Sequence, residues 1–258
     1  MDSISVDLIY GLPKQTFNGF KQTLASIIAA KPDRIALYHY AHMPTRIKAQ
    51  ALINESELPT SAEKLKLLGL SINTLVDAGY QHIGMDHFAL PDDPLCQSLA
   101  QDTLHRNFQG YSTHGDCDII GMGISAISQV AGCYSQNHKQ LKDYQTTISN
   151  GQLAVERGYS LSDDDRLRAE IIQQLMCRHI LVFDYFERMY SIIFTRYFAS
   201  ELNALAAMAQ DQLLTIDNET IKVTEKGRLM LRNIAMVFDL YLQNDNPANR
   251  ELRFSKVL

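Results

Sequence analysis

Residues 3–13 read SISVDLIYGLP, and this stretch decides how the first half of the chain folds. Its β-branched and aromatic residues favour a strand, and Gly11 and Pro13 end it. The strand is apolar along nearly its whole length, so we expect neighbouring strands on both of its sides.

A helix and a second strand follow. Thr16 is placed to cap a helix with apolar residues at positions 17, 20, 24, 27 and 28, the spacing of an amphipathic helix, and Pro32 ends it. Residues 34–41 then form another nearly continuous apolar run, which fits a parallel strand covered on both faces.

The alternation continues through a second helix. Thr60 and Glu63 have the spacing of a capping box, and Gly79 stands where a left-handed residue ends a helix. A third strand is expected from Tyr80 to about Phe88. The order predicts right-handed crossovers and a parallel sheet, either open or part of a barrel, and three strands are few for such a sheet.

Composition sets the broad class. The chain has 258 residues, of which 46% are apolar and 21% charged, with a net charge of −5. These values are typical of a soluble globular protein of one or two domains and argue against a surface for nucleic acid or anionic lipid. Since no stretch resembles a membrane span or a signal peptide, we expect a cytoplasmic protein.

The four cysteines are widely spaced. Cys96, Cys117, Cys133 and Cys177 are 21, 16 and 44 residues apart, far from the short spacing of zinc or iron–sulfur ligands. We expect them to be unrelated thiols in a reducing compartment.

Parallel α/β folds bind ligands at the carboxyl ends of their strands. His39 and His42 could there form a metal pair, and Asp86 and His87 an acid/base pair. Neighbouring Asp and His on a strand point to opposite faces, however, and a histidine near a strand end more often has a structural role.

Residues 121–126 match a loose dinucleotide-binding pattern, with Gly121, Gly123 and Ala126 at the required spacing. The match follows only a short apolar stretch and lies outside a clear strand–helix–strand unit. Close packing of backbone is therefore the favoured explanation, and a dinucleotide-dependent oxidoreductase is an alternative function.

The last hundred residues predict helices around one hairpin. Ser162 is placed to cap a helix, a second helix carries Phe194 to Leu205, and residues 213–216 and 220–224 form the hairpin. A final helix, capped by Thr224, closes a unit that resembles a winged helix. A DNA-binding module is thus an alternative, although acidic residues offset its basic ones.

Several motifs, in order along the chain, resemble the oxygen-independent coproporphyrinogen III oxidase family. They are DLIYGLPKQT (7–16), YAHMP (40–44), GMDHFA (84–89), HRNFQGY (105–111), GMGISAI (121–127) and the tail RFSKVL (253–258). The related haem-chaperone branch has a shorter motif in place of residues 105–111, so it is the less favoured alternative.

The resemblance implies an α/β fold: the C-terminal part of a partial (β/α) radical-SAM barrel, followed by a mostly helical, winged-helix-like C-terminal domain. We expect the second half of the barrel with its extension in residues 1–158 and the helical domain in residues 159–258. The implied activity belongs to porphyrin and haem biosynthesis. It is the oxidative decarboxylation of coproporphyrinogen III to protoporphyrinogen IX, using S-adenosyl-L-methionine and a [4Fe-4S] cluster, with electrons passed to an acceptor.

The family holds its cluster with a Cys-x-x-x-Cys-x-x-Cys motif, which this sequence lacks. We therefore expect a C-terminal portion of the enzyme, with no metal ligands and with the radical-generating residues outside the chain. On its own it is expected to neither hold the cluster nor turn over.

Carried over position by position, the resemblance assigns Asp7, Ala41 and Ile127 to S-adenosylmethionine binding. A carboxylate such as Asp7 can accept hydrogen bonds from ribose hydroxyls.

The four propionates of the substrate need hydrogen-bond donors. Arg106 is the main candidate, with His105, Gln109 and Tyr111 as accessories; alternatively, Arg106 pairs with Asp102 or Asp116 and only holds a loop in place. We expect a monomer without nucleic-acid or membrane partners.

Overall fold

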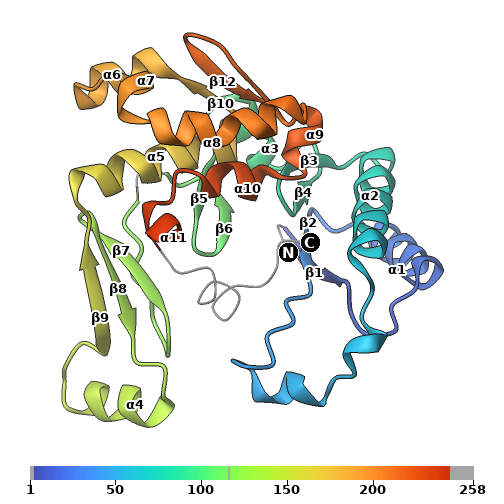
Figure 1. Cartoon of the computed structure of the whole chain (residues 1–258). Helices are drawn as coiled ribbons and strands as arrows, with labels where there is room; N and C mark the ends of the chain where they lie inside the picture. The colour runs from blue at the N-terminus through green and yellow to red at the C-terminus, as the bar shows by residue number, and fades with distance from the viewer. Residues whose placement is uncertain (1–2, 116, 245–258) are drawn as a thin grey trace.

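The computed structural model describes residues 3–115 and 117–244 (Figure 1). The tail motif at 253–258 lies outside the described residues. The first part of the chain contains β1 (Ser5–Tyr10), α1 (Phe17–Ala30), β2 (Arg34–His39), two 3₁₀ helices (Lys48–Leu52, Glu55–Glu57), α2 (Ser61–Asp77), β3 (Gln81–Gly84), β4 (His87–Ala89), α3 (Pro94–Ala100), β5 (His105–Asn107) and β6 (Gly110–Ser112). The middle contains β7 (Ile127–Val130), β8 (Cys133–Asn137), α4 (Leu141–Ser149) and β9 (Val155–Ser160). The last part contains α5 (Asp163–Arg178), β10 (Ile180–Val182), α6 (Phe183–Tyr190), α7 (Phe194–Tyr197), α8 (Ala199–Gln210), β11 (Leu214–Ile216), β12 (Thr220–Val223), α9 (Glu225–Arg228), α10 (Leu231–Met236) and α11 (Leu240–Asn244).

A four-stranded sheet in the order β1-β2-β4-β3 organises the first part. β1 and β2 are parallel, and Asp7 pairs with Ala36. Helix α1 crosses between them and begins as expected, since the Thr16 hydroxyl accepts a hydrogen bond from the Gly19 N–H at 3.1 Å. The capping box of Thr60 and Glu63 likewise opens α2.

The expected third parallel strand is wrong in one respect. Residues 80–88 do not form a single strand but a hairpin, in which β3 and β4 are antiparallel and β4 pairs antiparallel with β2. The chain reverses at Met85, which has a left-handed φ of 45°. β3 therefore keeps the direction of β1 and β2, but β4 is inserted between β2 and β3.

The two faces of this sheet differ. One packs against α1 and α2 and buries Leu8, Leu37 and Phe88. On the other face, Ile83 and Ala89 join the core formed with α3 and α5, whereas Ile9 is 45% exposed. Among the described strands β1 is at the edge of the sheet, so the expectation of neighbours on both sides is wrong there.

Strands β7, β8 and β9 form an antiparallel sheet that projects with α4 from the rest of the molecule (Figure 1). Gly121 lies just before this arm, and a Cβ at Gly121 would be 2.7 Å from the Ile127 carbonyl oxygen. The next regular element is strand β7 rather than a helix that could bind phosphate. This geometry supports close backbone packing, rather than a dinucleotide-binding loop, as the explanation for the glycine at position 121.

The last part is a helical unit with a small sheet, β10-β12-β11. The side chains of Phe186, Phe194, Phe198 and Phe238 are fully buried together in its core. The hairpin and the Ser162 cap are confirmed. The prediction of two long helices is wrong. The first is broken at Phe198 into α7 and α8, and the second is divided into α9, α10 and α11. These breaks allow apolar residues of successive helices to face the same core.

The expected domain boundary at residues 158 and 159 falls inside β9, and the division stays a prediction. None of the helices within 3–115 and 117–244 has the length and apolarity that crossing a membrane requires.

Candidate active site

The β5–β6 hairpin brings together the residues expected to bind substrate. Arg106 pairs directly with Tyr111 across the hairpin, and the guanidinium carbon is 5.7 Å from the centre of the tyrosine ring. His105 opens β5, and Gln109 lies in the turn, where its N–H donates to the Asn107 side chain at 2.8 Å. Their roles stay predictions, but their proximity follows directly from the register.

Arg106 keeps hydrogen-bonding capacity. Its Nε is buried and has no partner among the described residues. The alternative pairing with Asp102 is not formed within 3–115 and 117–244, and the Asp102 carbonyl instead accepts from Arg178 at 2.8 Å. Asp116 lies outside the described residues. The rest of the guanidinium likewise makes no hydrogen bond within the described residues, so its terminal nitrogens keep the capacity to bind a carboxylate.

Asp86 and His87 form a hydrogen-bonded pair next to this hairpin. The Asp86 carboxylate is 2.7 Å from the His87 Nδ1, which corrects the expectation that they point to opposite faces, because Asp86 lies in the turn before β4. Burial alone would raise the Asp86 pKa, but the hydrogen bond and charge of His87, with the charge of Arg106, lower it overall.

The His87 ring is held tightly by its neighbours. It packs edge-on against Tyr111 and Tyr38, with ring centroids 5.2 and 6.2 Å away. A Cβ at Gly110 would lie 2.9 Å from the His87 Nε2, so only glycine fits there, and its φ of 128° also favours glycine. The hairpin and the sheet are therefore closely fitted around the Asp86–His87 pair.

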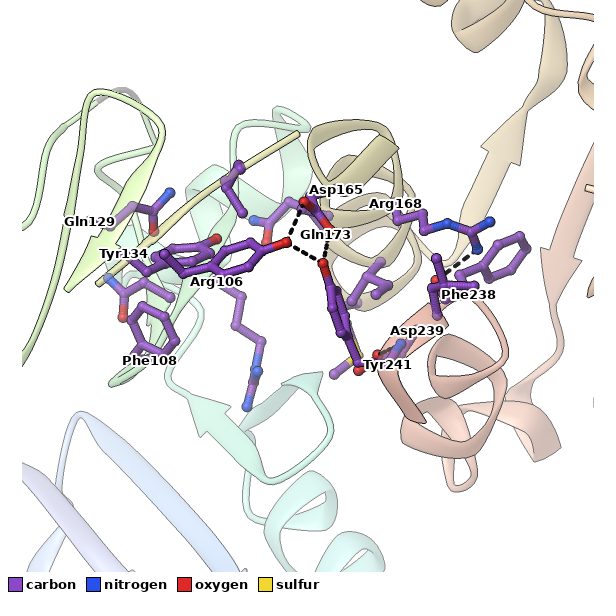
Figure 2. A pocket seen from close by; sticks show the side chains of 17 residues that line it. Arg106, Phe108, Gln129, Tyr134, Asp165, Arg168, Gln173, Phe238, Asp239 and Tyr241 are labelled. Atoms are coloured by element: carbon purple, nitrogen blue, oxygen red, sulfur yellow. Dashed lines mark hydrogen bonds between the residues drawn. The ribbon is translucent and has the colours of Figure 1, made fainter. Parts of the chain in front are cut away.

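A pocket of about 730 Å³ opens between the hairpin, the arm, α5 and α11 (Figure 2). Its lining is largely apolar and aromatic: Arg106, Asn107, Phe108, Gln129, Tyr134, Tyr159, Leu161, Asp165, Arg168, Ala169, Ile172, Gln173, Met176, Phe238, Asp239, Leu240 and Tyr241. Figure 2 shows the Arg106 side chain running along one edge, away from Asp165 and Tyr241. The volume lies within the range of small-molecule sites.

Asp165 organises the opposite edge of the pocket. It accepts hydrogen bonds from Tyr241 at 2.8 Å, Tyr159 at 3.1 Å and the Ser162 hydroxyl at 2.6 Å. Burial opposes ionisation of Asp165, but these hydrogen bonds outweigh it and lower the pKa to about 2. Sequence reasoning missed the pocket tyrosines, because they come from distant segments with no common motif.

The residues expected to bind S-adenosylmethionine are only partly brought together. Asp7 lies in the middle of β1 on the exposed face, and its carboxylate has no hydrogen-bond or ion-pair partner in the described part of the chain. Ala41 follows β2, and its carbonyl accepts from Gln50 at 3.0 Å. Ile127 opens β7 in a different sheet, across the molecule from β1 and β2 in Figure 1.

The histidines expected as a possible metal pair have separate surroundings. His42 lies 3.3 Å from the Glu55 carboxylate. The His39 ring packs beside Gly11, and burial, with the charges of Lys64 and Arg232, lowers its pKa to about 4. Within 3–115 and 117–244 no three His, Cys, Asp or Glu side chains converge as a metal site.

The four cysteines differ in burial: Cys96 and Cys177 are buried, whereas Cys117 and Cys133 are exposed. An iron–sulfur cluster needs converging thiolates, so the described residues do not fit one.

Comparisons with known proteins agree with this architecture. The family described as the HemN C-terminal domain matches residues 161–230. A solved structure of Escherichia coli coproporphyrinogen III oxidase (HemN), described as a radical SAM enzyme, superposes with a TM-score of 0.88 at 46% identity, covering 93% of this chain and 55% of that one. The fold is therefore that of part of a radical SAM enzyme of the HemN type, as the sequence predicted.

Two relatives identify the family. The oxygen-independent coproporphyrinogen III oxidase of Pseudomonas aeruginosa is 48% identical over 99% of this chain and 55% of its own length. That of Thermostichus vulcanus is 42% identical over 94% of this chain and 75% of its own length. The chain belongs to the oxygen-independent coproporphyrinogen III oxidase family. It spans about half the length of several of the curated relatives it matches.

Proposed function

We propose that the chain carries substrate- and cofactor-binding residues of an oxygen-independent coproporphyrinogen III oxidase. The reaction converts two propionates of coproporphyrinogen III to vinyl groups, with loss of CO₂, and passes electrons to an acceptor. The observation that carries this proposal is the 48% identity over 99% of the chain. The proposal includes a monomer in the cytoplasm, without membrane or nucleic-acid partners.

In this proposal Arg106 binds a substrate propionate, assisted by His105, Gln109 and Tyr111. The Arg106 guanidinium makes no hydrogen bond within the described residues, which supports this role because its terminal nitrogens can pair with a carboxylate. The adjoining pocket of about 730 Å³ has the size and the aromatic lining that a tetrapyrrole ring requires.

Asp7, Ala41 and Ile127 are proposed to contact S-adenosylmethionine. The exposed Asp7 carboxylate fits hydroxyl or amino donors of this ligand. Bound S-adenosylmethionine and a [4Fe-4S] cluster supply the radical chemistry. Because the described cysteines do not fit a cluster, we propose that its ligands lie outside these 258 residues and that the chain alone does not turn over.

Binding of coproporphyrin III, the stable oxidised form of the substrate, tests the substrate site through porphyrin fluorescence. We expect saturable binding, weakened about tenfold by Arg106→Met, as the loss of one charge-assisted hydrogen bond predicts. Arg188→Met is the matched control, because Arg188 is exposed on α6 and pairs only with Asp184 among its described neighbours. A wild-type chain that does not bind coproporphyrin III would defeat the proposed substrate site.

The second part of the proposal is tested by reconstituting the chain with iron and sulfide. We expect no cluster absorbance band. Its appearance would show that the chain itself holds the cluster.

A further inference from the structure

Helix α5 of the helical unit forms hydrogen bonds with both strands of the β5–β6 hairpin. Tyr111 on β6 donates its hydroxyl to the Met176 carbonyl at 2.9 Å, a buried hydrogen bond. Gln173, one turn earlier on α5, faces the backbone of β5. The hairpin is therefore fixed from two positions one turn apart on the same helix.

The Gln173 amide forms the more specific of these contacts. The amide is oriented so that both its oxygen and its nitrogen form hydrogen bonds. The oxygen accepts from the Arg106 N–H at 2.6 Å and from the His105 Nδ1 at 2.8 Å, and the nitrogen donates to the Arg106 carbonyl at 3.0 Å. Both backbone groups of Arg106 are thus bound by one side chain. Only the guanidinium of Arg106 is left to recognise a ligand.

The rest of the hairpin has little freedom to adjust. A Cβ at Gly84 would lie 2.3 Å from the Tyr111 hydroxyl, so the sheet closes tightly behind β6. Gln173 and Arg106 also line the same pocket. A shift of the β5 backbone would move the Arg106 guanidinium along the pocket edge, and hydrogen bonds to a carboxylate depend strongly on such geometry.

We propose that Gln173 is a positioning residue, which acts through the Arg106 backbone to aim the guanidinium at a carboxylate of the ligand. The inference rests on the proposed function, in which Arg106 binds a propionate. It adds a role for the helical unit: α5 sets the orientation of a substrate-binding side chain that belongs to the other part of the molecule.

The test compares coproporphyrin III with its tetramethyl ester, which keeps the ring but lacks the carboxylates. Gln173→Met preserves the length of the side chain and removes its hydrogen bonds. We expect the preference for the acid over the ester to fall about fivefold or more, while the affinity for the ester changes little. A purely structural role would weaken both ligands alike.

Gln174→Met is the matched control, since Gln174 is the adjacent glutamine on α5 and does not line the pocket. We expect it to leave the preference unchanged. If Gln173→Met fails to fold, Gln173→Leu replaces it, because Leu is also uncharged and also removes the hydrogen bonds to Arg106; a reduced acid preference supports the proposal and an unchanged one overturns it.

A double-mutant cycle gives the second measurement. In an Arg106→Met background, Gln173→Met should have no further effect on the acid preference, because Gln173 acts through Arg106. Additive losses would overturn the positioning role. Absence of any acid preference in the wild-type chain would instead contradict the proposed function, so the two failures are distinguishable.

Discussion

The helical unit and the four-stranded sheet are closed to different degrees. The helical unit surrounds a continuous core of phenylalanines, including Phe186, Phe194 and Phe198, whereas β1 packs on one face only and exposes Asp7 and Ile9 on the other. A closed core gives a rigid support, and an open face leaves side chains accessible to ligands. The helical unit therefore supports one wall of the pocket, to which α5 and α11 contribute, while the outer face of β1 stays open.

One arginine from each part shows a difference in hydrogen-bond partners. In the helical unit Arg168 is held by Asp164 and Glu201, each at 2.8 Å. Burial disfavours ionised Glu201, but the hydrogen bonds from Ser200 and Arg168 outweigh it and lower its pKa. Near the sheet, the Arg106 Nε has no partner among the described residues. The Arg228 Nε of α9 also lacks a partner among the described residues, so this difference concerns Arg168 and Arg106 rather than the two parts as a whole.

The strongest way to break the closed unit is to empty its core. Phe186 is fully buried, and Phe186→Ala should lower the free energy of unfolding by about 3–5 kcal/mol. Urea denaturation measures this loss. Met189→Ala, on the exposed side of the same helix, should change it by no more than about 0.5 kcal/mol. Equal effects would show that the core is not closed.

Removing one charge from the ion network should have the next largest effect. Arg168→Met leaves Glu201 buried without its cation, which should cost about 3 kcal/mol of unfolding free energy. Arg188→Met, which breaks an exposed pair with Asp184, should cost less than about 1 kcal/mol. Similar costs for the two variants would contradict the contrast between satisfied and exposed charges.

Acid should weaken the junction between the two parts. His179, at the end of α5, has its pKa lowered to about 4 by burial, with added repulsion from Arg228 and His82 of β3. The unfolded chain takes up this proton near pH 6.5, so stability is lost as the pH falls from about 6.5 to 4.

In urea unfolding at pH 7 and pH 5, His179→Gln should therefore reduce the difference between the two pH values. The exposed His114→Gln should leave that difference unchanged. A wild-type protein equally stable at both pH values would disprove the prediction.

The smallest expected effect tests the open face. Ile9→Ala should change the unfolding free energy by no more than about 0.5 kcal/mol, because the side chain is already 45% exposed. Leu8→Ala, one residue earlier and on the buried face, should cost about 2–4 kcal/mol. A large loss for Ile9→Ala would mean that this face is covered in solution.

Local signals in the sequence predicted local structure well. Thr16, Thr60 and Ser162 cap helices as expected, because capping needs only a side chain and the next few N–H groups. The same reasoning failed at residues 80–88, where the reversal at Met85 depends on β4 pairing with β2. Pairing with a distant strand leaves no periodic signal in a single segment.

In the candidate site, too, local features could be predicted from the sequence and contacts between distant residues could not. The sequence alone determined the motif of residues 105–111 and the family it resembles, because those residues are contiguous. Only the tertiary structure decided that Gln173 binds the Arg106 backbone, that Asp165 gathers two tyrosines at a pocket, and that Ile127 lies in a separate sheet. These contacts join residues far apart in the chain, and their positions are fixed by how the helices and sheets pack rather than by any local preference.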